Sequence, residues 1–88
     1  MNALTAKDAS KTISETEDLI ILDTRDYLIF ADGFITGSIF IGLNERFEDL
    51  VISLIPPGLT ILMVTAPGKE DETAKRLKKA GFDKIAGY

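Results

Sequence analysis

The sequence predicts an α/β domain of three layers, in which helices flank a small, mostly parallel sheet. Short apolar runs alternate along the chain with segments whose apolar residues recur at helical spacing, a pattern typical of parallel sheets. The run from Leu59 to Ala66 is apolar apart from two threonines, as expected of a strand covered on both faces. It breaks at Pro67-Gly68 and leads into an amphipathic segment, so strand, turn and helix follow one another there.

The first element is a predicted helix over residues 6–15. Thr5 fits the N-cap position of a capping box, and Asp8 can reach back to it from the third helical position. Ile13 belongs to the buried stripe, so the predicted role of this helix is packing.

Two short strands come next. Residues 19–22 form an apolar run bounded by charges, and the polar segment 23–26 follows it directly. Residues 27–31 fit a single helical turn that ends before Asp32-Gly33. The second predicted strand covers residues 39–41.

A helix over residues 45–55 precedes the long apolar run. Asn44 is a good N-cap residue for it, and Pro56-Pro57-Gly58 ends it. Its apolar residues recur at i, i+3, i+4, i+7 and i+8, which predicts one buried stripe. That stripe consists of Phe47, Leu50, Val51, Leu54 and Ile55.

The last helix is predicted over residues 69–80. Acids occupy its first turn and bases its end, an order that complements the helix dipole. Gly81 fits the left-handed position that terminates many helices. A short strand over residues 84–86 then closes the sheet, and the chain stops at Tyr88, which leads us to expect a single domain over residues 1–88 cut from a longer protein.

Composition excludes several classes of partner and site. The chain has 88 residues and a net charge of −4, so it is one small domain for which nucleic acid and anionic membranes are poor partners. Its longest apolar runs are too short to span a bilayer, and no signal-peptide core is visible, so we expect a cytoplasmic setting. Cysteine and histidine are absent, which excludes thiolate or imidazole zinc sites, disulfides, persulfide carriers and Cys–His or Ser–His pairs.

Three segments, in order, resemble a rhodanese-like domain. Residues 22–26 (LDTRD) are similar to the family's Leu-Asp-Val-Arg-Asp, and residues 33–41 (GFITGSIFI) to its Gly-His-Ile-Pro-Gly-Ala-x-Asn-Ile. Residues 80–85 (AGFDKI) look like its Ala-Gly-Phe-x-x-Val ending. The resemblance implies the rhodanese fold, with an active loop between the long strand and the last helix.

The residues that carry the family's chemistry differ in this chain. Aligned on Gly68, the loop Cys-x-x-Gly-x-Arg reads Thr65, Ala66, Pro67, Gly68, Lys69, Glu70. Phe34 stands where the family has its histidine, and Thr36 where it has its proline. A threonine hydroxyl has no thiolate-like form and cannot store sulfur as a persulfide. We therefore expect a vestigial loop with no catalytic residue, no metal and no cofactor.

The loop and the segments 69–72 and 82–88 are similar to a narrower group. They look like the first, degenerate rhodanese-like domain of metallo-β-lactamase–rhodanese fusion proteins, some of which handle sulfane sulfur. This resemblance implies that neighbouring domains of the same polypeptide are the partners. It also implies a parent protein that is a metal-dependent hydrolase or a persulfide dioxygenase.

Three classes of function stay open on the sequence. The first is a non-catalytic module that spaces or docks domains, with Asp23 and Arg25 as a structural pair near the loop and Tyr27 and Phe34 as candidates for partner contact. The second is capture of a small anion by the backbone N–H groups of residues 65–69. The third is a carboxylate metal or phosphoryl-acceptor site formed by Asp23, Asp26, Glu70 and Asp71.

Overall fold

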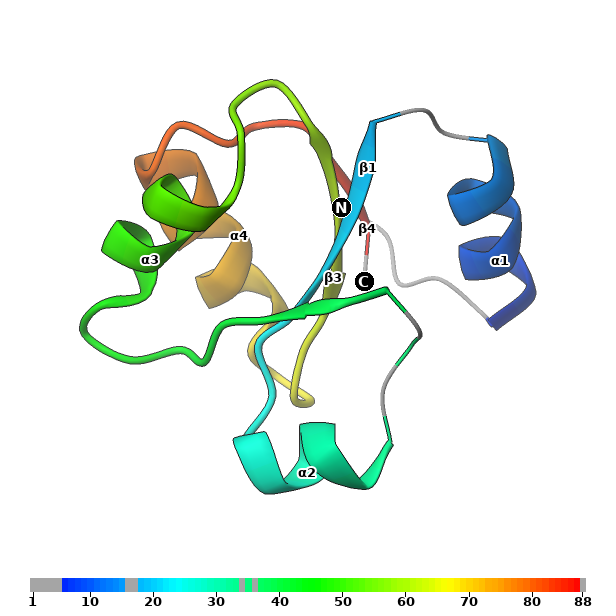
Figure 1. Cartoon of the computed structure of the whole chain (residues 1–88), viewed down its shortest axis with the longest axis horizontal. Helices are drawn as coiled ribbons and strands as arrows, with labels where there is room; N and C mark the ends of the chain where they lie inside the picture. Colours follow the sequence, from blue (N-terminus) through cyan, green and yellow to red (C-terminus); the bar gives the residue numbers. More distant parts are fainter. Residues whose placement is uncertain (1–5, 16–17, 34, 36, 88) are drawn as a thin grey trace.

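The computed structural model describes residues 6–15, 18–33, 35 and 37–87, which form four helices and four strands (Figure 1). The helices are α1 (Ala6–Glu15), α2 (Tyr27–Asp32), α3 (Phe47–Leu54) and α4 (Glu70–Lys79). The strands are β1 (Leu19–Asp23), β2 (Ile39–Phe40), β3 (Thr60–Val64) and β4 (Ile85–Gly87). The predicted helix over residues 6–15 is confirmed, whereas Thr5 of its capping box lies outside the described residues.

The strands form one sheet in the order β2-β1-β3-β4, and every neighbouring pair is parallel. β1 and β3 lie in the middle and pair along their whole length, from Leu19 opposite Thr60 to Asp23 opposite Val64. The predicted α/β class with a small parallel sheet is therefore confirmed.

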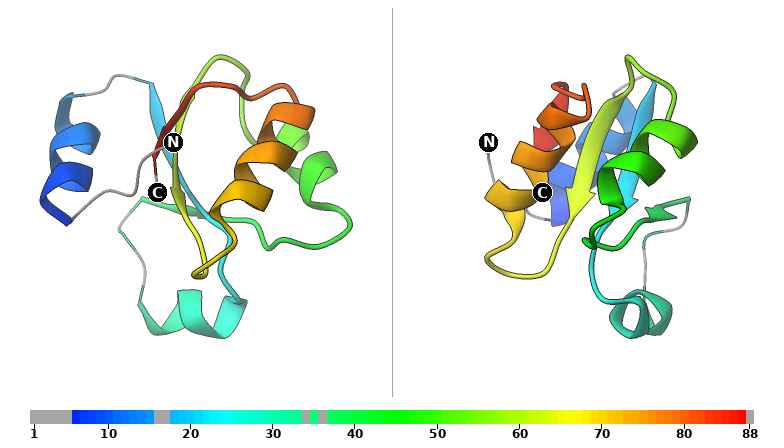
Figure 2. Two further views of the ribbon diagram at one scale, coloured as in Figure 1. Left: turned by 180° about the vertical axis from the view of Figure 1, so that it is seen from behind. Right: turned by 90° about the vertical axis from the view of Figure 1, so that its left-hand side faces the viewer.

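Helices cover both faces of this sheet (Figure 2). α3 and α4 lie on one face and α1 lies on the other, which gives three layers. The short helix α2 belongs to neither layer, because it sits beyond the carboxyl ends of β1 and β3. That position places α2 at the edge where parallel sheets bind ligands.

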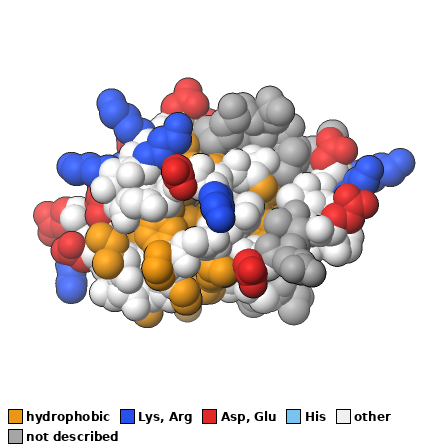
Figure 3. All heavy atoms as spheres, turned by 90° about the horizontal axis from the view of Figure 1, so that it is seen from above, with side chains coloured by type: hydrophobic (Ala, Val, Ile, Leu, Met, Phe, Trp, Pro, Cys, Tyr) orange, Lys and Arg blue, Asp and Glu red, His pale blue; other side chains and the backbone are white. Residues whose placement is uncertain are grey.

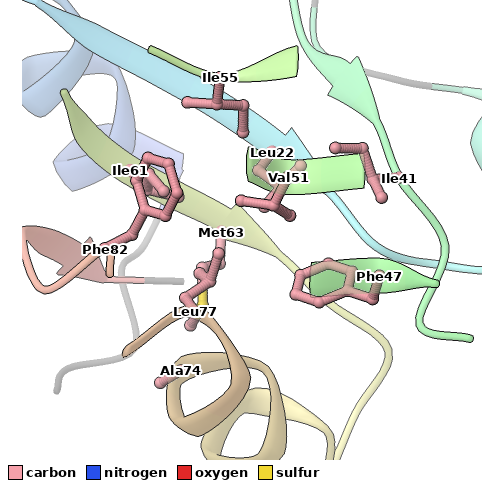
Figure 4. Close-up of a cluster of buried hydrophobic side chains, with 10 residues drawn as sticks. All are labelled: Leu22, Ile41, Phe47, Val51, Ile55, Ile61, Met63, Ala74, Leu77 and Phe82. Carbon is pink, nitrogen blue, oxygen red and sulfur yellow. The ribbon is translucent and has the colours of Figure 1, made fainter. Parts of the chain in front are cut away.

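The main core fills the space between the sheet and the pair α3 and α4 (Figure 4). Alternate strand residues point into it, as the two-residue period of a strand requires. Leu22 comes from β1, Ile61 and Met63 come from β3, and all three are at most 1% exposed. The remaining buried members of the cluster are Ile41, Phe47, Val51, Ile55, Ala74, Leu77 and Phe82.

The buried stripe of α3 is narrower than the sequence predicts. Phe47, Val51 and Ile55 are buried, but Leu54 is 56% exposed, so its predicted place in the core is wrong. The buried face is centred on positions i, i+4 and i+8, and residues at i+3 and i+7 lie on its flank. Hydrophobic side chains accordingly reach the surface on the side of the molecule that α3 covers (Figure 3).

The start of α3 also differs from the prediction. The Asn44 side chain accepts a hydrogen bond from the backbone N–H of Arg46 (2.8 Å), and the Asn44 carbonyl accepts one from Phe47 (3.1 Å). Asn44 thus closes a turn over its own neighbours, an alternative that asparagine side chains favour. The helix begins at Phe47, two residues later than predicted.

Two sets of hydrogen bonds define the end of α4 and its contact with α3. Gly81 has a φ of +97°, and hydrogen bonds from Phe82 to Leu77 (2.9 Å) and from Gly81 to Lys78 (3.0 Å) complete a Schellman motif. The predicted role of Gly81 at the end of this helix is therefore confirmed. On the other side, Arg76 donates to both carboxylate oxygens of Glu48 on α3 (2.9 and 2.6 Å).

Within the residues that the structure describes, no helix is long and apolar enough to cross a membrane.

Candidate functional site

Three loops and α2 meet at the carboxyl edge of the sheet and enclose a hollow of about 280 Å³. One loop follows β1, one follows β2, and the third joins β3 to α4. Its wall includes Thr24, Tyr27, Phe40, Leu43, Ala66 and Lys69. The hollow lies where open parallel sheets place their binding sites.

The end of β1 is fixed by a buried ion pair. Asp23 is fully buried, and Arg25 donates to its two carboxylate oxygens, from Nε at 3.0 Å and from Nη2 at 2.7 Å. The same Nη2 atom donates to the carbonyl of Gly33 (2.8 Å), just beyond α2. The hydrogen bonds that Arg25 donates to Asp23 raise the pKa of the Arg25 guanidinium. The pair therefore ties β1 to the far end of α2.

Backbone bonds hold the same strand end to both neighbouring strands. The N–H of Thr24 donates to the carbonyl of Val64 in β3 (2.9 Å). The N–H of Ile41 donates to the carbonyl of Asp23 (3.0 Å). The carboxyl edge is thus a rigid frame on which the loops are mounted.

The loop between β3 and α4 is a tight turn. The N–H of Lys69 donates to the carbonyl of Ala66 (3.1 Å), with Pro67 and Gly68 as the two central residues. Gly68 has a φ of +84°, and proline followed by a glycine of positive φ is the signature of a type II turn. This local chemistry explains why the chain can leave the strand and enter α4 within a few residues.

Glu70 closes the loop on itself. Its Oε1 atom accepts a hydrogen bond from the backbone N–H of Gly68 (3.2 Å). At the other side of the turn, the N–H and the hydroxyl of Thr73 both donate to the carbonyl of Lys69 (3.0 and 2.7 Å). An anion that approached the N–H of Gly68 would have to displace the chain's own carboxylate.

Thr65 is poorly placed to act as a nucleophile. It is half-buried at the end of β3, while Ala66 and Lys69 are the residues of this loop on the wall of the hollow. A nucleophilic hydroxyl needs a base beside it, and the sequence contains no histidine. The nearby cation Lys69 lies 3.9 Å from Glu72, and both side chains are more than half exposed.

The four carboxylates considered for a metal site are not brought together. Asp23 is engaged by Arg25, and Asp26 accepts a hydrogen bond from the N–H of Leu28 (3.0 Å) as the N-cap of α2. Among the residues with described positions, no group of three or more histidine, cysteine or acidic side chains could hold a metal ion. Three of the four, Asp23, Asp26 and Glu70, have local structural partners instead, so the metal-site hypothesis is wrong for this arrangement.

The feature that sequence reasoning identified only in part is α2. Tyr27, named as a candidate for partner contact, is 61% exposed beside the hollow, whereas Phe34 lies outside the described residues. The neighbours Leu28 and Ile29 are exposed as well, at 76% and 53%. The sequence shows an apolar run over residues 27–31 with an acid at each end, but such a run does not by itself distinguish a surface from a core segment.

Comparison with known proteins agrees with the architecture. The family model described as the rhodanese-like domain matches residues 5–88. Two crystal structures of rhodanese-like domains of the Alr3790 protein from Anabaena sp. superpose with TM-scores of 0.72. They are 25% and 27% identical, and the alignments cover 80% and 91% of this chain and 74% and 82% of theirs.

A third structure, of the Alr3790 protein from Anabaena sp., shares the fold with a TM-score of 0.76 at 24% identity. The alignment covers 90% of this chain and 64% of that one. A comparison with curated protein sequences found no match.

Proposed function

Because this chain belongs to the rhodanese-like domain family, we propose that it acts as a non-catalytic module that spaces or docks domains in a larger protein. Residues 1–88 would be one domain of that protein, and its partners would be the neighbouring domains of the same polypeptide. Two of the similar structures are themselves described as domains of a protein, which supports this organisation.

The proposal that the domain is non-catalytic rests on the absence of cysteine. Sulfur transfer of the rhodanese type needs a thiolate that accepts a sulfur atom as a persulfide, and the sequence has no cysteine at any position. The position that aligns with the family's cysteine is Thr65. A threonine hydroxyl does not ionise near neutral pH, and it has no sulfur atom on which a persulfide could form. In this proposal residues 65–70 are the vestige of an active loop.

The charge at the loop supports the same conclusion. The Glu70 carboxylate accepts a hydrogen bond from the Gly68 N–H group. Asp71 and Glu72 follow Glu70 in the first turn of α4. An acid about 4 Å from an anionic sulfur donor costs on the order of 1–4 kcal/mol, depending on the local dielectric. A donor such as thiosulfate would therefore meet repulsion where the family's loop provides attraction.

The parent protein in this proposal has a metallo-β-lactamase fold and acts in sulfur metabolism, as a metal-dependent hydrolase or a persulfide dioxygenase. The support is the resemblance of residues 65–72 and 82–88 to the degenerate rhodanese-like domain of such fusion proteins. A cytoplasmic location belongs to the same proposal.

Capture of a small anion by residues 65–69 is the second candidate. The adjoining hollow and the exposed Lys69 favour it, and the bond between Glu70 and Gly68 opposes it. Amide shifts at residues 68–70 on addition of thiosulfate or phosphate would support anion capture, whereas unchanged amides would dismiss it.

The first experiment is a thiosulfate-to-cyanide sulfur-transfer assay of the purified chain, with a cysteine-containing rhodanese as positive control. We expect the rate to equal that of the blank without protein. Turnover above that blank would overturn the non-catalytic assignment.

A further inference from the structure

The short helix α2 and the segment after it expose several large apolar side chains. We use the name α2 surface for Tyr27, Leu28, Ile29 and Ile35, whose side chains are 40–76% exposed. No residue of α2 is buried. Contiguous exposed apolar residues of this kind commonly mark interaction sites.

The α2 surface is held in place by contacts of its own. Asp26 caps the start of the helix, and Arg25 binds the Gly33 carbonyl at its end. Tyr27 and Phe30 pack on Phe40 of β2, with ring centroids 5.5 and 4.9 Å apart. A six-residue helix has little stability alone, so these ties explain why it forms and presents Leu28 and Ile29 outward.

The hollow lies directly beside the α2 surface. Tyr27 belongs to both, and Phe40, Leu43 and Ala66 form the rest of the apolar part of the wall. A volume of about 280 Å³ lies just below the usual range of sites for drug-sized molecules and suits one large side chain. Anchoring of one apolar side chain in such a pocket is the usual arrangement at the centre of a protein interface.

The charges around this edge are mainly negative. Asp26 and Asp32 stand at the two ends of α2, and the first turn of α4 brings Glu70, Asp71 and Glu72 to the same edge. Two cations, Lys69 and Arg25, lie on the wall of the hollow, and each lies beside an acid, Glu72 and Asp23 respectively. With the chain at a net charge of −4, a complementary surface carries lysine or arginine.

From these observations we infer that the α2 surface and the adjoining hollow form a docking site for a protein segment that inserts one large apolar side chain between flanking lysine or arginine residues. This inference deepens the proposed docking function and rests on it. The aromatic wall would receive the apolar side chain, and Asp26 and Asp32 would face the cations of the partner.

A second copy of the chain fits this site less well. Apart from the α2 surface itself, the large exposed hydrophobic residues among those described are Ile52 and Leu54, which lie on α3, away from the carboxyl edge. A contact between α3 of one copy and α2 of the next joins different surfaces, and it extends without limit unless the rotation between copies closes a ring. The experiment below separates this outcome from a distinct partner.

The test uses two synthetic helical peptides of about 15 residues. One presents a phenylalanine flanked by lysines, and the other carries glutamates in place of those lysines. We expect the lysine peptide to shift the amide signals of residues 26–33 and 40–44, with an affinity that falls as salt is added. The glutamate peptide should bind at least about tenfold more weakly.

Variants locate the contact. Leu28→Gln and the hollow-filling Gly42→Leu should each weaken the lysine peptide about tenfold. A Cβ atom at Gly42 meets Phe40 Cζ at 3.5 Å and Asn44 Nδ2 at 3.9 Å, both ordinary contacts, and circular dichroism checks that the variant folds. Ile52→Gln, at a position on α3 that is also exposed (60%, against 76% for Leu28), is the matched control and should leave the affinity within twofold.

Equal binding of both peptides, or no binding of either, would overturn the docking inference. Concentration-dependent self-association that Ile52→Gln abolishes would overturn it in favour of a second copy. Neither result would restore sulfur transfer, so the docking inference and the non-catalytic proposal fail separately.

Discussion

The core beneath α3 and α4 and the loop between β3 and α4 are held together in different ways. The core is tied by contacts between distant parts of the sequence, such as the ion pair of Arg76 with Glu48. The hydrogen bonds of the loop are made to immediate neighbours in the sequence: the Lys69 N–H donates to the Ala66 carbonyl, and the Gly68 N–H donates to the Glu70 carboxylate. A locally satisfied loop can change its chemistry without disturbing the frame, which is how a fold can persist after its activity is lost.

The largest expected effect concerns Phe47, the fully buried first residue of α3. Phe47→Ala should lower the free energy of unfolding by about 3–5 kcal/mol, because it leaves a cavity in a close-packed core. Leu54→Ala, on the exposed flank of the same helix, should change it by about 0.5 kcal/mol or less. Urea unfolding of both variants measures the contrast, and equal losses would mean that α3 is not oriented as described.

A smaller effect is expected within the loop, at Gly68. Its φ of +84° strains any residue with a Cβ atom, although nothing lies within 4 Å of the place that a Cβ would take. Gly68→Ala should therefore cost about 1–2 kcal/mol through the backbone alone. Gly33→Ala is the matched control, because Gly33 also has free space and an extended φ of −177°. Similar melting temperatures for the two variants would contradict the type II turn.

The smallest effect appears as a dependence on pH. Hydrogen bonds from Arg76 lower the pKa of Glu48 from 4.5 to about 2. The unfolded chain takes up this proton near pH 4.5, but the folded chain does not until about pH 2. The stabilisation is therefore complete above pH 4.5 and is lost as pH falls toward 2.

Glu48→Gln removes that dependence, so the stability difference between the variant and the unmodified chain should shrink over the same pH range. Glu45→Gln, at an exposed position nearby, serves as the control and should show no such trend. A difference for Glu48→Gln that stays constant down to about pH 2 would mean that the pair with Arg76 is not formed in solution.

Much of the fold could be predicted because the strands and helices depend on local patterns. The apolar runs gave β1, β2, β3 and β4 to within one or two residues, and Gly81 marked the end of α4 by its position alone. Which residues of α3 are buried was harder to predict from the sequence. Leu50 and Leu54 lie on the flank of a buried stripe whose centre is set by the sheet beneath it. The turn at Asn44 was missed because a side chain that caps a helix can equally close a turn.

At the candidate site the position of the loop could be predicted from the sequence, but its internal contacts could not. The glycine at position 68 located the turn, whereas the bond from Gly68 to Glu70 depends on a side-chain direction that spacing does not determine. The exposure of α2 could not be predicted either, because an apolar run of five residues is as typical of a core segment as of a surface.

The most direct measurement of the central claim is the sulfur-transfer rate of Thr65→Cys compared with Thr65→Cys/Glu70→Arg, with folding of both variants checked by circular dichroism. The single variant should stay close to the blank because Glu70 still holds the loop amide, and the double variant should transfer sulfur measurably faster. A single variant that is already as fast as the double variant would contradict the account, because the acid at position 70 would then have no part in the proposed lack of sulfur transfer.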